Sequence, residues 1–153
     1  MRSPALLLLG VLLLCAACTN TGSKSTLEGI DTREVTLPNG KVIHAELAID
    51  PAMMQRGLMF RKSLAPDRGM LFIHEKQGRW QYYMFQCYIS LDMIWMDNDH
   101  RIVEISADTP PCRSDVASEC PVYGGHADAR YVLELAAGEA KKNGLKTGDQ
   151  LSF

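Results

Sequence analysis

The tripeptide Pro38-Asn39-Gly40 constrains the fold of this chain more than any other feature, because it separates two runs of alternating polar and apolar residues. The first run covers residues 33–37 and the second covers residues 41–49. Asn-Gly between such runs is the strongest short signal of a β-hairpin, since both residues tolerate the positive φ angles of a tight turn. The sequence therefore predicts two antiparallel strands joined by this turn.

Further short apolar runs bounded by turn residues continue the β pattern along the chain. The expected strands cover residues 69–73, 80–96 (one bent strand or two), 101–105, 131–135 and 150–153. With the hairpin they make about seven strands with little helix between them, which excludes a doubly wound sheet. We therefore predict a mainly β fold, a small antiparallel β-barrel-like domain with two short helices.

Both expected helices have recognisable ends. The first covers residues 51–57, where Asp50 accepts hydrogen bonds from free amides, Pro51 is preset for the first turn and Gly57 ends the helix. The second covers residues 136–143 and is capped by Gly144. Each helix is too short to cover much of a sheet, so the core must come mainly from the strands.

The start of the chain has the order of a secretion signal. Arg2 is followed by an apolar run from Ala5 to Leu14 and then by small residues. The run is about half the length that a membrane-spanning helix needs. Ala16-Ala17-Cys18 resembles the lipobox of bacterial lipoproteins, in which a peptidase cleaves before a cysteine that carries lipid, although Cys15 stands where leucine is usual. We predict a lipoprotein-type signal peptide over residues 1–17 and lipidation of Cys18; the alternative is an ordinary secreted protein.

Three parts are therefore expected: the signal peptide, a lipidated polar tether over residues 18–26, and a single globular β-rich domain over residues 27–153. By the resemblance to lipoproteins, Thr19 in place of Asp favours the outer membrane. The predicted location is the periplasmic face of the outer membrane, with the lipid anchor as the contact with the membrane.

The formal net charge is −2 and becomes more negative when Arg2 leaves with the leader. That balance excludes general nucleic-acid binding, which needs a basic face.

Export makes disulfides available to the three cysteines of the expected domain. Cys112 and Cys120 lie in a proline-bracketed loop with room to close a bridge. A zinc site would need more ligands than nearby His126, and a redox pair usually has closer spacing. We predict a structural disulfide between Cys112 and Cys120. Cys87 lies in an apolar run, where a free thiol acts as a small hydrophobic group rather than as a nucleophile.

Metal and cofactor sites are not indicated. Seven of the eight methionines lie between Met53 and Met96, and thioethers can bind Cu(I). Their places inside apolar runs are more typical of core residues. The four histidines are widely scattered, and the acidic segment 97–99 lacks the glycine and distal glutamate of a calcium loop, so it is expected to form a turn. We predict no metal and no cofactor.

Five ordered motifs resemble a bacterial and archaeal family called domain of unknown function 192. The motifs are QRGLMFRKSL, GMLFIHE, MFQCYISLDMIWMD, the PC…CP-x-Y loop and YVLELAAG…GLKTGDQLSF, within about residues 30 to 153. The resemblance implies a compact β-rich fold and, for many members, an exported or lipid-anchored form, but no reaction. The third motif usually begins Trp-Met-Lys-Asn-Thr, whereas this chain has Tyr-Met-Phe-Gln-Cys at residues 83–87.

The resemblance points to four polar candidates in the matching motifs: Arg56, Arg61, Asp92 and Glu134. The arginines could bind an anionic ligand of the envelope, because guanidinium forks fit carboxylate and phosphate. They could equally pair with Asp92 or Glu134 to balance buried charges.

Three functions fit these residues. The first is a non-catalytic envelope module that binds a ligand through the two arginines. An alternative is an envelope hydrolase acting on carbohydrate or peptide through Asp92 and Glu134. The third is an accessory of an envelope complex that contacts a protein partner through Trp80, Tyr82 and Tyr83.

Overall fold

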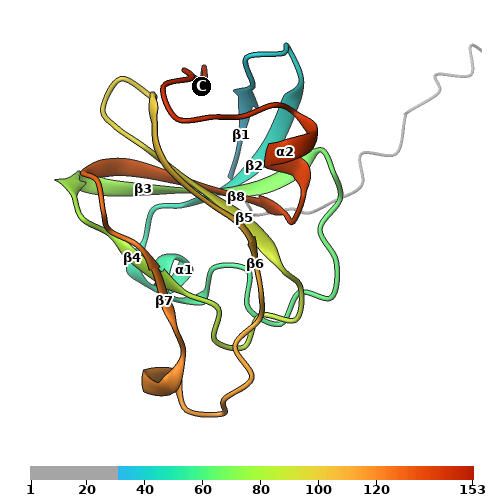
Figure 1. Cartoon of the computed structure of the whole chain (residues 1–153), viewed down its shortest axis with the longest axis vertical. Coiled ribbons are helices and arrows are strands. Elements are labelled where there is room, and N and C mark those ends of the chain that lie inside the picture. Colours follow the sequence, from blue (N-terminus) through green and yellow to red (C-terminus); the bar gives the residue numbers. More distant parts are fainter. Residues whose placement is uncertain (1–30) are drawn as a thin grey trace, which may run out of the picture.

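The computed structural model describes residues 31–153, and its largest unit is a six-stranded sheet with the order β1-β2-β3-β8-β5-β6 (Figure 1). The predicted signal peptide, Cys18 and the tether lie outside the described residues. The strands of this sheet are β1 (Thr32–Thr36), β2 (Val42–Ala48), β3 (Arg68–Gly78), β5 (Leu91–Met96), β6 (Ile102–Thr109) and β8 (Ala129–Ala136).

The predicted hairpin is confirmed, because β1 and β2 pair antiparallel on either side of the Asn39-Gly40 turn. Gly40 has a φ of 84°, a conformation that glycine adopts without strain. Strands β2 and β3 run parallel, since α1 (Pro51–Arg56) and the loop after it carry the chain back to the same end of the sheet. The other neighbouring strands are antiparallel, so the mainly β, antiparallel-rich fold with two short helices is as predicted.

The six-stranded sheet is barrel-like but is not closed. Among the described residues its edge strands, β1 and β6, do not pair with each other. The expected last strand over residues 150–153 forms only isolated bridges, from Ser152 to Thr36 of β1 and from Gln150 to Arg101 beside β6. Gln150 and Ser152 therefore contact opposite edges of the large sheet, and each contact is a single bridge rather than part of a continuous strand pairing.

Strands β4 (Gln81–Tyr83) and β7 (Val122–Gly124) form a second, two-stranded sheet. The run over residues 80–96 is thus divided into β4 and β5, and β7 was not expected from the sequence. A Cβ atom on Gly124 would lie 2.2 Å from the ring of Trp95, so the backbone of β7 contacts this indole directly. This close packing positions the small sheet on one face of the large one.

The first helix matches its expected ends more closely than the second. The side chain of Asp50 accepts hydrogen bonds from the amides of Ala52 and Met53 at 3.0 and 2.9 Å, which caps α1 as predicted. The second helix, α2 (Glu139–Lys142), is shorter than expected and is followed by Gly144 with a φ of 69°. Within residues 31–153, no helix has the length and hydropathy needed to cross a membrane.

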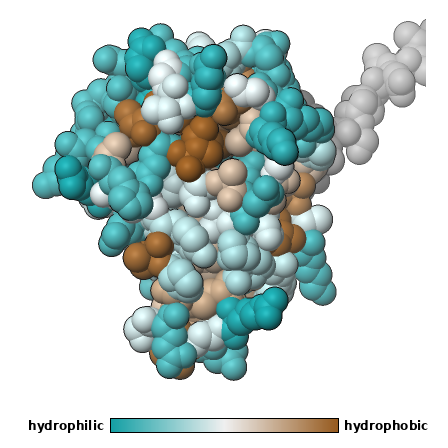
Figure 2. All heavy atoms as spheres, viewed as in Figure 1, coloured by the Kyte–Doolittle hydropathy of each residue, from teal (hydrophilic) through white to brown (hydrophobic). Residues whose placement is uncertain are grey.

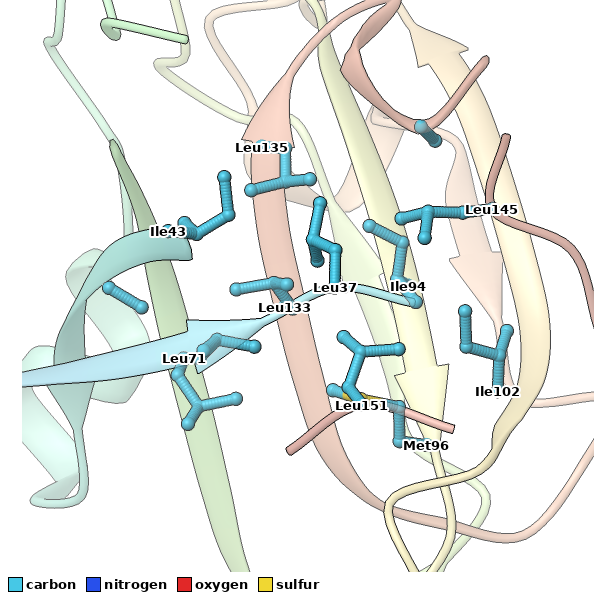
Figure 3. Close-up of a cluster of buried hydrophobic side chains, with 13 residues drawn as sticks. Leu37, Ile43, Leu71, Ile94, Met96, Ile102, Leu133, Leu135, Leu145 and Leu151 are labelled. Atoms are coloured by element: carbon cyan, nitrogen blue, oxygen red, sulfur yellow. The ribbon is translucent and has the colours of Figure 1, made fainter. Parts of the chain in front are cut away.

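Alternate residues of the large sheet point to opposite faces and build two apolar cores. The barrel core lies between the sheet, α2 and the C-terminal segment and is shown in Figure 3. The second, here called the α1-side core, lies on the other face beneath α1, β4 and β7. Of the methionines expected to fill the core, Met70, Met84 and Met93 are buried in the α1-side core and Met96 in the barrel core.

Candidate functional site

The four candidate residues do not form one cluster. In the pairing of β5 with β8, Asp92 lies opposite Leu135 and Met93 lies opposite Glu134. Paired residues point to the same face of a sheet and successive residues to opposite faces, so Asp92 and Glu134 point to opposite faces. Because the two carboxyl groups do not share a cleft, the arrangement that a two-carboxylate hydrolase needs is absent from this pair.

Asp92 is a fully buried group whose hydrogen bonds are made within the protein. Its Oδ1 accepts a hydrogen bond from the amide of Asp108 at 2.8 Å, and its Oδ2 accepts one from the amide of Ala140 at 2.7 Å. Asp108 lies near the end of β6, and Ala140 lies in the first turn of α2. The carboxylate therefore holds two elements against β5 and has both oxygens occupied.

Arg61 pairs with Glu46, a carboxylate that was not among the sequence candidates. Its guanidinium donates two hydrogen bonds to Glu46, at 2.7 and 2.5 Å, and Arg68 lies 3.8 Å from the same carboxylate. Glu46 is buried in the middle of β2, on the face that also carries the loop after α1. The expected partners were Asp92 and Glu134; Asp92 lies on the other face of the sheet. Arg61 thus completes the fold, through a different partner from the two expected.

Arg56 and Glu134, by contrast, line one pocket with a volume of about 160 Å³. Its walls come from α1 and the loop after it, from β3, β4 and β8, and from Cys87. Glu134 is only 5% exposed whereas Arg56 is exposed, so Glu134 lies at the inner end and Arg56 at the rim. A cavity of about 150 Å³ can hold a benzene ring, so the pocket has room for one small group.

The carboxyl group of Glu134 has no hydrogen-bond or ion-pair partner within residues 31–153. Burial raises its pKa from 4.5 to about 8, because removal from water disfavours the charged form. At neutral pH the isolated group is therefore mostly protonated. A nearby cation would reverse this preference.

Aromatic side chains fix the pocket wall around Glu134. The Nε2 atom of His74 lies 3.0 Å from the hydroxyl of Tyr82, and the His74 ring stacks on Trp80 with 4.0 Å between centroids. Phe72 contacts Tyr82 edge to face at 5.1 Å. Burial lowers the pKa of His74 to about 4, and burial followed by the charge of Glu134 raises the pKa of Tyr82. Both groups are therefore neutral at pH 7.

The cysteines lie as the sequence indicated. Cys112 and Cys120 form a disulfide with 5.5 Å between their Cα atoms, and the loop between them carries the 3₁₀ turn η1 (Ala117–Glu119). Cys87 is free and buried; burial first, and the charge of Glu134 second, raise its pKa to about 12. A thiol with this pKa is a poor nucleophile at neutral pH.

The aromatic residues expected to form a contact patch have different surroundings. Trp80 and Tyr82 are half-buried in the pocket wall, whereas Tyr83 is exposed. Two other aromatic residues, Phe60 and Tyr88, are also exposed and meet edge to face at 6.1 Å, but they do not line this pocket. On the face seen in Figure 2, hydrophobic areas are small and separated by hydrophilic ones. Glu134 and Arg56, two of the candidates indicated by the sequence motifs, thus line one pocket, whereas no motif indicated the aromatic wall or His74 beside them.

Comparison with known proteins identifies relatives over most of the chain. The family DUF192, described as "Uncharacterized ACR", matches residues 34–153. A solved structure of a protein of unknown function from Novosphingobium aromaticivorans is 28% identical with a TM-score of 0.74 and covers 83% of this chain and 89% of its own. One from Sinorhizobium meliloti, described as a "putative transcription regulator", is 32% identical with a TM-score of 0.71 and covers 80% of this chain and 94% of its own. No curated protein matches the chain.

Proposed function

We propose that this chain, which belongs to the DUF192 family, is a non-catalytic envelope protein that binds a small ligand between Arg56 and Glu134. In this proposal the protein is exported and anchored by lipid. The description of the family names no activity, so the pocket is the basis of the proposal. The observation that carries this proposal is the carboxyl group of Glu134, which is 5% exposed and has no partner among the described residues. It lies at the inner end of a pocket with an aromatic wall.

The other buried carboxyl groups show how unusual Glu134 is in this fold. Glu46 is paired with Arg61, and Asp92 accepts two backbone hydrogen bonds. Glu139 contacts Lys41 at 2.6 Å and Lys142 at 3.0 Å. Burying a carboxyl group without a partner is costly, and such groups with shifted pKa values are typical of binding and catalytic sites. Glu134 therefore fits a role in binding better than a role in stability.

Arg56 supplies the second recognition group. It forms no ion pair within residues 31–153. It lies at the rim of the pocket, and Glu134 lies at the inner end of the same pocket. A guanidinium group binds carboxylate or phosphate through paired hydrogen bonds. We therefore assign Arg56 to an anionic group of the ligand, whereas Arg61 is occupied by Glu46.

Export and lipid anchoring are supported by the amino-terminal sequence. The charged start, the apolar run and the small residues before Cys18 follow the order of a lipoprotein signal. The Cys112–Cys120 disulfide fits an oxidising compartment such as the periplasm. In this proposal, lipid at Cys18 holds the domain through residues 18–26 at the periplasmic face of the outer membrane. Mass spectrometry of the envelope-purified protein should find a lipid-modified Cys18 as the first residue; an unmodified amino terminus would contradict the anchor.

A ligand screen tests the binding function itself. The mature protein is purified in detergent and screened by thermal shift against anionic sugars, amino acids, wall fragments and nucleotides. We expect a ligand that raises the melting temperature of the parent but not of Arg56→Ala or Glu134→Gln. Arg33→Ala is the matched control, since it removes an exposed arginine from β1, outside the pocket. Equal shifts in all four proteins would place the ligand elsewhere, and the pocket proposal would fail.

A further inference from the structure

The surroundings of Glu134 identify the chemical class of the ligand. This inference rests on the ligand-binding function proposed above. We propose that the pocket binds a small zwitterion, with its ammonium group against Glu134 and its carboxylate or phosphate group at Arg56. The inner end of the pocket thus carries a carboxyl group and the rim a guanidinium group, in the order that such a ligand would match.

The inner end of the pocket offers what an organic cation needs. Beside the Glu134 carboxyl group, the pocket is lined by the rings of Phe72, Trp80 and Tyr82. The negative faces of aromatic rings attract ammonium groups, and the attraction is stronger when the cation is removed from water. A carboxylate among such rings adds a full negative charge. A cation is thereby favoured over a neutral group of the same shape.

Among residues 31–153, no cationic side chain forms an ion pair with Glu134 at this position. The titratable groups that face Glu134 in the pocket are His74 on β3, Tyr82 on β4, Cys87 in the loop after β4, and Arg56 on α1. Burial lowers the pKa of His74 and raises those of Tyr82 and Cys87, so all three are neutral at pH 7. Arg56 forms no ion pair with Glu134 in the described part of the chain. When Glu134 ionises, we assign the positive charge that balances it to the ligand.

The size of the pocket limits the ligand. A volume of about 160 Å³ accommodates a trimethylammonium group or an amino acid backbone, and not a sugar chain. The ligand chemistry can come from a free amino acid or betaine, or from the headgroup of a lipid. Glycine betaine and phosphocholine represent these two sources as soluble probes.

The first test compares probes that differ in one charge at a time. Isothermal titration of the full mature protein uses four probes: glycine betaine, phosphocholine, choline and 3,3-dimethylbutanoate. Choline lacks the anion, and 3,3-dimethylbutanoate replaces the ammonium nitrogen of betaine with carbon. We expect betaine or phosphocholine to bind tightest. Choline should bind about fivefold more weakly, since an exposed ion pair contributes up to about 1 kcal/mol. Binding of 3,3-dimethylbutanoate should be weaker than that of betaine by at least about thirtyfold, because a buried charge pair contributes 2 kcal/mol or more.

Two variants assign these charges to residues. Glu134→Gln should lower the affinity for betaine and for choline alike, whereas Arg56→Ala should lower only the affinity for betaine, to the level of choline. Arg33→Ala should change neither. Circular dichroism and melting temperature establish that each variant is folded, and Glu134→Asp, which retains the charge, should retain part of the affinity.

The pH dependence gives a result that a purely structural role of Glu134 would not produce. A cation requires ionised Glu134, so binding at pH 7 must release the proton that the free pocket holds. The affinity for betaine should therefore rise with pH between 6 and 8 by up to about tenfold per pH unit and level off above 8. In Glu134→Gln the profile should be flat.

The outcomes separate this inference from the binding function on which it rests. Equal binding of betaine and its carbon analogue, or an affinity that falls as pH rises, would mean that protonated Glu134 donates a hydrogen bond to a neutral or anionic ligand. The proposal of a zwitterionic ligand would then be wrong, while the pocket would remain the binding site. If betaine, choline and phosphocholine do not bind at millimolar concentration, the proposal of a zwitterionic ligand is also wrong. The ligand screen with the Arg56 and Glu134 variants then tests the binding function separately.

Discussion

Asp92 and Glu134 are buried carboxyl groups on neighbouring strands, yet their surroundings are opposite. Asp92 points to the face with the barrel core, and each of its oxygens accepts a backbone hydrogen bond. Glu134 points to the α1-side face and has no partner among residues 31–153. The pair teaches that burial alone does not define the role of a carboxyl group. A group whose hydrogen bonds are complete stabilises the fold, and one left incomplete beside a pocket is available to a ligand.

The two cores show the same difference on a larger scale. In the barrel core, apolar side chains from all six strands of the large sheet meet those of α2 and the C-terminal segment (Figure 3). The α1-side core is interrupted by the pocket between α1, β3, β4 and β8. We therefore expect substitutions of polar groups to reduce stability on the first face and to affect binding on the second.

The largest expected loss of stability is that of Asp92→Ala. The substitution removes two hydrogen bonds to a charged acceptor and leaves the amides of Asp108 and Ala140 without partners in the interior. The free energy of unfolding should fall by about 3–4 kcal/mol, as measured by urea denaturation at pH 7. Asp92→Asn, which retains one acceptor oxygen, should lose about half as much. A loss below about 1 kcal/mol for Asp92→Ala would contradict the stabilising role.

Glu134→Gln should change the free energy of unfolding in the opposite direction, by an amount that depends on pH. The pKa of Glu134 is about 8 in the folded protein, above its ordinary value of 4.5, so the folded state retains a proton that the unfolded chain releases. The free energy of unfolding of the parent should therefore fall as pH rises from about 4.5 to 8 and then stay constant. The variant lacks this decrease. It should be about equally stable at pH 4.5 and more stable than the parent at pH 8, by up to about 4 kcal/mol, because each unit of the pKa shift corresponds to about 1.4 kcal/mol.

The control for this prediction is Asp92→Asn, which should reduce stability at both pH values because its two hydrogen bonds are lost or weakened throughout. Urea denaturation at several pH values gives all the required free energies. If the stability of the parent increases relative to that of Glu134→Gln between pH 5 and 8, the folded protein must contain a partner that stabilises the ionised form, and the comparison between the two carboxyl groups would break down.

The two arginines provide the next contrast. Arg61→Ala leaves the buried Glu46 with only Arg68, at 3.8 Å, so the free energy of unfolding should fall by about 1.5 kcal/mol. This value is below the range for fully buried pairs because a third of the Arg61 side chain is exposed. Arg56→Ala should change stability by less than about 0.5 kcal/mol. Similar losses in both variants, measured by denaturation, would mean that Arg56 also completes the fold.

The features that the sequence predicted correctly are those set by local chemistry. The Asn39-Gly40 turn, the Asp50 cap and the Cys112–Cys120 bridge each depend on residues close together in the chain. The features that it missed depend on how distant strands align. Strand β7 has three residues and no alternating pattern of useful length, and its position is set by contact between Gly124 and Trp95.

The candidate site follows the same rule. Motif positions were enough to single out Arg56 and Glu134, because a polar residue within an apolar motif stands out. They were not enough to pair Arg61 with Glu46, or to show that Asp92 and Glu134 point to opposite faces. Those facts depend on the register between β5 and β8 and on the path of the loop after α1, and a shift of one residue would exchange the faces.

The smallest expected effect concerns Cys87, which lines the same pocket as Glu134 and can report on its charge. The Cys87 thiol, whose pKa is about 12, should react with iodoacetamide far more slowly in the folded protein than in urea, because the thiolate is the reactive form. The charge of Glu134 is the second cause of this pKa, after burial. Glu134→Gln should therefore accelerate alkylation at pH 9, where Glu134 is ionised in the parent, and have little effect at pH 7. Equal acceleration at both pH values would instead indicate that the variant opens the pocket, and the charge of Glu134 would not be the cause.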